Sequence, residues 1–213
     1  MSDHDDFAFE PIKGLPERPP VGEDILWQGR PATYALARDA YKLHWIAFYF
    51  ALLLLWRCGV GLAEGGMLMA LQIGIPTLVM ALIALGLVWL LAFAQARTTV
   101  YTLTSARVVM RIGAALPVTF NIPFAQVGAA HLDLRRDGTG TIAMETTGAS
   151  RIGYLTLWPH LRPGYARLTQ PAMRCIPDAA PVARMLAEAA ETRMARPVVS
   201  RGEGGSASPV AAA

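Results

Sequence analysis

Side chains that could do chemistry are few and widely spaced in this chain. Its 213 residues include four histidines and two cysteines, and no two histidines lie close enough in sequence to suggest a pair of metal ligands. The sequence contains no nucleophile elbow, phosphate-binding loop, HExxH motif or CxxC motif. Because catalysis needs titratable groups that converge, we expect a protein that is not an enzyme and that holds no metal site.

The composition excludes other classes of protein. Hydrophobic residues make up 54% of the chain and charged residues 16%, with a mean hydropathy of +0.35. Soluble domains typically carry about 25% charged residues. The net charge of +3 comes without a dense Lys/Arg run, so we expect no nucleic-acid partner and only a weak attraction to anionic lipid.

Two apolar stretches dominate the chain. They cover residues 43–63 and 67–94 and are separated only by Glu64, Gly65 and Gly66. A bilayer core of ~30 Å requires about 20 apolar residues of helix. The sequence therefore predicts a transmembrane α-helical hairpin over residues 43–96.

Basic residues flank this hairpin on the side of both termini. They are Arg30, Arg38 and Lys42 before it and Arg97, Arg107 and Arg111 after it. The connecting loop has none. The positive-inside rule therefore predicts a multi-pass inner-membrane protein with both termini in the cytoplasm.

From residue 98 the apolar residues alternate with polar ones, as they do in strands. The alternation runs through 101–103, 108–112, 118–124, 132–135, 142–144, 152–158 and 173–176, and a helical pattern covers 179–194. We expect an α+β or all-β domain over 97–195, with about seven antiparallel strands and one C-terminal helix. We also expect residues 1–42 to form an N-terminal arm with a short strand and an interfacial helix, and residues 196–213 to form a disordered tail.

Two segments resemble known families. The segment YTLTSARVVMRIG at 101–113, directly after the hairpin, resembles the bacterial membrane-anchored PH domains, in which a Y-x-L-T-x-x-R hairpin opens a PH-like domain. The arm at 9–20 and 22–31 resembles the PuhB-type photosynthetic complex assembly proteins of purple bacteria.

The second resemblance implies a non-enzymatic factor of the photosynthetic (intracytoplasmic) inner membrane. Such a factor assists assembly of the reaction centre with its core light-harvesting antenna, whose subunits are its partners. The alternative is a generic membrane-anchored PH-like scaffold or lipid-binding module that is unrelated to photosynthesis.

Two polar residues of the first apolar stretch suggest binding sites. His44, beside Trp45, can ligate the magnesium of a bacteriochlorophyll, or it is an interfacial polar residue without a ligand. Arg57 either snorkels or pairs with Glu64, or it contacts a partner's membrane helix. Small residues in both stretches allow close packing within the hairpin, or a seam for a homodimer or a client helix.

The domain offers two further candidate surfaces. A loop rich in Pro and Gly has the aromatic and basic composition of a protein interface, unless its aromatic residues pack into the sheet; its candidate partner contacts are Trp158, His160, Arg162 and Tyr165. Arg107 and Arg111 are expected near the membrane face, where they contact lipid phosphates or simply anchor the topology.

Overall fold

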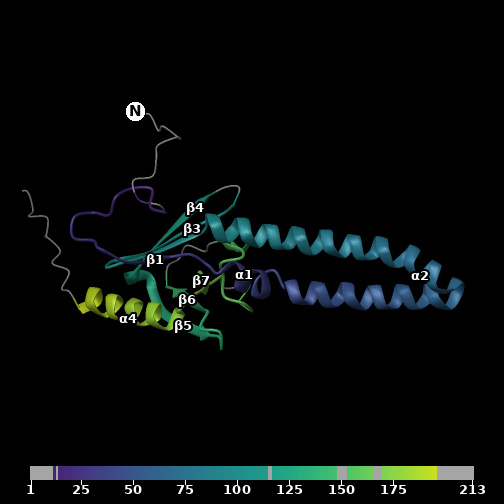
Figure 1. Cartoon of the computed structure of the whole chain (residues 1–213). Coiled ribbons are helices and arrows are strands. Elements are labelled where there is room, and N and C mark those ends of the chain that lie inside the picture. Colours follow the sequence, from purple (N-terminus) through teal and green to yellow (C-terminus); the bar gives the residue numbers. More distant parts are fainter. Residues whose placement is uncertain (1–11, 13, 115–116, 148–152, 166–168, 196–213) are drawn as a thin grey trace, which may run out of the picture.

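A computed structural model describes residues 12, 14–114, 117–147, 153–165 and 169–195 of the chain (Figure 1). The predicted tail and the first part of the arm lie outside these residues. The elements are β1 (Ile25–Gly29), α1 (Thr33–Asp39), α2 (Leu43–Thr98), β2 (Val100–Thr104), β3 (Arg107–Ile112), β4 (Val118–Pro123), the 3-10 turn η1 (Phe124–Gln126), β5 (Val127–Leu134), β6 (Gly140–Thr146), α3 (Tyr154–Leu157), β7 (Ala172–Ile176) and α4 (Ala179–Ala195).

Two antiparallel sheets and α4 enclose the main hydrophobic core. The sheets have the strand orders β1-β2-β3-β4 and β5-β6-β7. Alternate residues of β2 and β3 enter the core, and α4 covers it with the buried face Ala179, Val182, Leu186 and Ala189. Each large apolar side chain buried in this way contributes about 1.5–3 kcal/mol to stability. The predicted sheet and C-terminal helix are confirmed.

The seven strands of the described residues are not the seven that the pattern predicts. The prediction of a strand over 152–158 is wrong, because Tyr154–Leu157 form the single turn α3, in which the Trp158 amide donates to the Tyr154 carbonyl at 2.9 Å. A short apolar run of this kind is compatible with one helical turn as well as with a strand. The seventh strand is instead β1 from the arm, where the Gln28 amide donates to the Thr102 hydroxyl at 2.9 Å.

α2 is 56 residues long and, among the described residues, is the one helix long and apolar enough to cross a membrane. Its backbone leaves helical geometry at Gly65 and Gly66, where Gly66 has φ 72°. This left-handed conformation suits glycine. The two arms of α2, residues 43–64 and 67–98, lie side by side and extend away from the sheets (Figure 1). A Cβ at Gly61 of the first arm would lie only 2.7 Å from the Cα of Ala70 in the second.

The end of the second arm packs on α1. The Trp89 ring lies 6.5 Å from the Tyr34 ring, and Leu36 and Ala96 are buried together in a small second core with Cys175. After α2 only Thr99 separates the helix from β2. The last turns of α2 are therefore part of the folded domain, and α2 continues almost directly into the first sheet.

Candidate functional site at the base of the long helix

A buried polar network centred on His160 lies where α2 meets the sheets. His160 follows α3 and is fully buried. The Tyr101 hydroxyl lies 2.5 Å from its Nδ1 atom. Its Nε2 atom lies 3.0 Å from the Gln95 side-chain amide of α2 and 3.2 Å from the Thr99 hydroxyl. One imidazole therefore touches the end of α2, the single linking residue and β2.

Arg174 of β7 extends this network. Its backbone N–H donates to the Tyr101 hydroxyl at 3.2 Å, so this hydroxyl joins β7 to His160. Its guanidinium donates to the Pro159 carbonyl at 3.0 Å. Its Nε atom is buried without a partner among the described residues. Burial, helped by the Arg174 charge, lowers the pKa of His160 to about 3, and burial raises the pKa of Tyr101. His160 is therefore uncharged at neutral pH and links the end of α2, Thr99 and β2 through hydrogen bonds.

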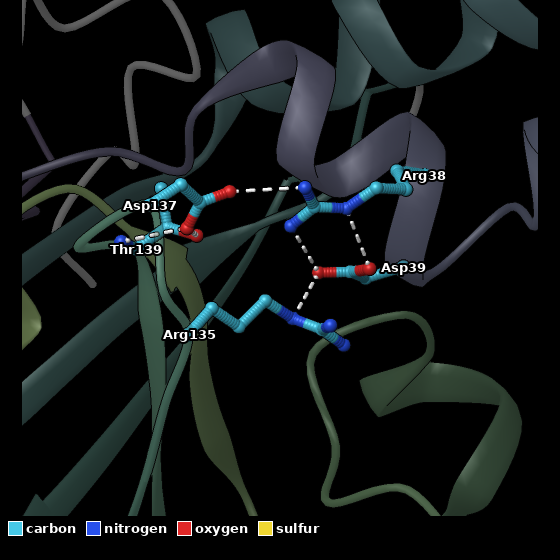
Figure 2. Close-up of polar contacts among 5 residues, drawn as sticks. All are labelled: Arg38, Asp39, Arg135, Asp137 and Thr139. Atoms are coloured by element: carbon cyan, nitrogen blue, oxygen red, sulfur yellow. Dashed lines mark hydrogen bonds and ion pairs between the residues drawn. The ribbon is translucent and has the colours of Figure 1, made fainter.

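A second cluster joins α1 to the turn between β5 and β6 (Figure 2). The buried Asp39 carboxylate accepts from Arg38 at 3.0 and 3.2 Å and pairs with Arg135 Nε at 2.6 Å. Arg38 also reaches Asp137 at 2.9 Å, and the Thr139 hydroxyl donates to Asp137 at 2.6 Å. The Thr139 hydroxyl and Arg38 lower the pKa of Asp137 to about 2, and Asp39 and Asp137 raise that of Arg38. The cluster holds α1, and with it the base of α2, on the second sheet.

The Asp39→Asn variant tests this clamp. We expect the free energy of unfolding to fall by about 1–2 kcal/mol. This is less than the usual loss when one partner of a buried ion pair is removed, because both arginines are partly exposed. Denaturant unfolding measures it. The control Asp137→Asn removes an exposed carboxylate and should cost less. Equal losses in the two variants would contradict the role given to Asp39.

Lowering the pH from 7 to 5 is expected to reduce the free energy of unfolding by about 2 kcal/mol through His160. The unfolded imidazole has a pKa near 6.5 and takes up a proton in this range, whereas the folded one, with a pKa of about 3, stays neutral. The stability is present above pH 6.5 and is lost as the pH falls toward 3. Urea midpoints at both pH values measure it. His160→Gln should remove this loss of stability between pH 7 and pH 5, and the control His131→Gln should keep it.

The residues of the predicted partner loop differ in their exposure. Trp158 is 44% exposed and packs edge-on against Tyr41 at 5.2 Å, just before α2 begins. Arg162 stacks over the exposed Tyr165 ring at 4.2 Å. We call Trp158, Arg162 and Tyr165 the aromatic–basic patch. The prediction that His160 contacts a partner at the surface is wrong, because its hydrogen bonds require the buried position.

The other predicted site residues lie on α2 and β3. His44 is exposed at the start of α2, with its ring 5.7 Å from that of Trp45. Arg57 is exposed on the first arm. Arg111 pairs in register with Val100, next to the end of α2. Arg107 lies at the other end of β3 and binds Glu23 at 2.8 Å.

Sequence reasoning missed Asp39, Gln95, Tyr101 and Arg174 as members of a site. Two of them carried a signal. Gln95 is polar at the end of an apolar segment, and Tyr101 opens the segment that resembles the PH family. Asp39 and Arg174 had none, because Arg135, which binds Asp39, and Tyr101, which binds Arg174, are distant from them in sequence.

Comparison with known proteins adds three findings. A family model described as bacterial PH domain matches residues 47–190. A Rhodobacter capsulatus protein, described as an uncharacterized 23.7 kDa protein in the puhA 5′ region, is 48% identical over 214 residues, which cover 99% of this chain and all of that protein. No solved structure matches the chain.

Proposed function

Because this chain belongs to the bacterial PH domain family, we propose that it is a membrane-anchored, non-enzymatic assembly factor for the photosynthetic reaction centre and its core light-harvesting antenna. Two observations support the photosynthetic part. The arm resembles the PuhB-type assembly proteins, and the description of the 48% identical relative places that protein in the puhA 5′ region.

In this proposal the two arms of α2 span the inner membrane as a hairpin, with both termini on the cytoplasmic side. The first arm is about 33 Å long at ~1.5 Å per residue, close to the ~30 Å bilayer core. A stretch of the same length, counted from the start of the second arm, ends near Trp89, where the second arm begins to pack on α1. Trp45, Trp89 and Tyr34 then lie at one level, as membrane-interface aromatic residues do.

The observation that carries the proposal is the way the domain is held on α2. The network around His160 and the cluster around Asp39 bind the base of α2 to both sheets. In this proposal the membrane surface lies near Trp158 of the aromatic–basic patch, because Trp158 packs on Tyr41 just before α2 begins. There the patch can bind the cytoplasmic ends of client subunits, while the arms pack beside their membrane helices. The chemistry is binding and release.

Purification of the tagged protein from pigmented membranes in mild detergent tests this function. We expect near-infrared bacteriochlorophyll absorption and co-eluting reaction-centre or antenna polypeptides. Loss of pigment alone in His44→Ala would assign His44 as the pigment ligand. A colourless preparation with only lipid or unrelated membrane proteins would favour the generic PH-like scaffold.

A double variant of the patch, Trp158→Ala with Tyr165→Ala, locates the client contact. We expect it to reduce the co-eluting polypeptides while the protein stays in the membrane. Leu132→Ala is the matched control, because Leu132 is 43% exposed on β5, outside the patch. Unchanged co-elution in the patch variant would remove the patch from the proposal.

A further inference from the structure

Arg57 is a cation on the apolar first arm of α2, and none of the described residues pairs with it. Its side chain is exposed and makes no ion pair or hydrogen bond within the part of the chain that the structure describes. The alternative pairing with Glu64 is not formed there. An ionisable group at membrane depth is costly unless a partner satisfies it. Arg57 is therefore a binding point for an anion that lies outside the described residues.

The surroundings of Arg57 define the shape of that partner. Trp56, Arg57 and Val60 of the first arm and Ile73 of the second line a groove of about 210 Å³ between the arms. Its walls are aromatic and aliphatic, and Arg57 supplies the charge. Trp56 is 64% exposed, so the groove opens toward whatever surrounds α2. A molecule with an anionic head and an aliphatic chain complements this lining.

Depth identifies the head as a lipid phosphate, on the proposed function's premise that α2 spans the membrane. Arg57 precedes the reversal at Gly65 by eight residues, or about 12 Å of helix. A long arginine side chain directed toward the reversal covers much of this distance by snorkelling. Its guanidinium then lies at the headgroups of the leaflet that faces away from the domain, where phosphates are always present. An acidic residue inside a partner's membrane helix is rare by comparison.

We infer that this groove is a binding site for an anionic phospholipid. Arg57 holds the phosphate through charge-assisted hydrogen bonds, for which a planar guanidinium is well suited. One acyl chain lies along Val60 and Ile73, against the Trp56 ring.

Native mass spectrometry of the full-length protein in detergent, titrated with phosphatidylglycerol or phosphatidylcholine, tests the inference. We expect phosphatidylglycerol to bind more tightly than phosphatidylcholine. In Arg57→Gln the affinity for phosphatidylglycerol should fall about tenfold. Arg57→Lys should keep part of the affinity, because it keeps the charge. The matched control is Arg97→Gln, at the other end of α2, where Arg97 lies over the Phe93 ring at 5.1 Å. Equal affinity in Arg57→Gln and wild type would overturn the inference.

A photoreactive amino acid at position 60 distinguishes the occupants in native membranes. An adduct with lipid supports the inference, and a cross-link to a polypeptide overturns it. Alkaline carbonate extraction separates the two proposals. Release of the protein from the membrane would contradict the anchor of the proposed function, whereas a retained protein without lipid preference contradicts only the lipid site.

Discussion

Replacing His160 by alanine is expected to lower the free energy of unfolding by about 3–4 kcal/mol. The substitution empties a fully buried position, and it removes the partner of the Tyr101 hydroxyl, the Thr99 hydroxyl and the Gln95 amide at once. A cavity and several unsatisfied polar groups add their costs. Because these groups hold α2 on the sheets, the base of α2 should loosen before the strands separate.

Thermal or denaturant unfolding of the detergent-solubilised protein measures the loss. The matched control is His131→Ala, since His131 is exposed on β5 and its side chain lies 3.5 Å from the exposed Glu145 carboxylate; its effect should stay within about 0.5 kcal/mol. Tyr101→Phe, which removes one hydroxyl and no ring, should lie between the two. Equal stability of His160→Ala and His131→Ala would show that the network does not hold the junction.

Gly61→Leu is expected to separate the two arms of α2. A Cβ at this position meets the backbone of Ala70, with 2.7 Å to its Cα and 2.9 Å to its nitrogen, and a backbone cannot yield as a flexible side chain can. Close approach of membrane helices depends on such small residues. We expect a loss of about 2–3 kcal/mol, at the upper end of the cost of overpacking.

Cys58 is a native reporter of this seam, because its thiol lies 4.0 Å from the Ala70 carbonyl oxygen. Its labelling by a small maleimide should become faster in Gly61→Leu. Gly59→Leu is the control on the same arm, since a Cβ there has nothing within 4 Å. If both variants label Cys58 at the wild-type rate, the arms are not packed through Gly61.

Local patterns predicted much of the fold. Period-two alternation located β2, β3, β4, β6 and β7. Helical spacing of Val182, Leu186 and Ala189 gave the buried face of α4. These predictions succeed because each rests on residues close in sequence that share one face or one turn.

Most of the candidate site was beyond such reasoning. His160 lies on a Pro/Gly loop whose composition is that of a surface, and its side chain is buried among groups 59 to 65 positions away. Asp39 became the centre of a clamp because Arg135 is brought to it by the turn of another sheet. Neither partnership leaves a local pattern in the chain.

The sequence by itself determined that α2 is apolar enough to cross a membrane, that it can reverse at Gly65–Gly66, and that strands and a terminal helix follow. Composition and short-range periodicity suffice for these, since the hydrophobic effect and backbone sterics act locally. Only the tertiary structure decided that β1 joins the sheet, that residues 154–157 turn instead of extending, and that the end of α2 belongs to the domain. Those outcomes depend on which distant surfaces bury each other and which buried polar groups find partners.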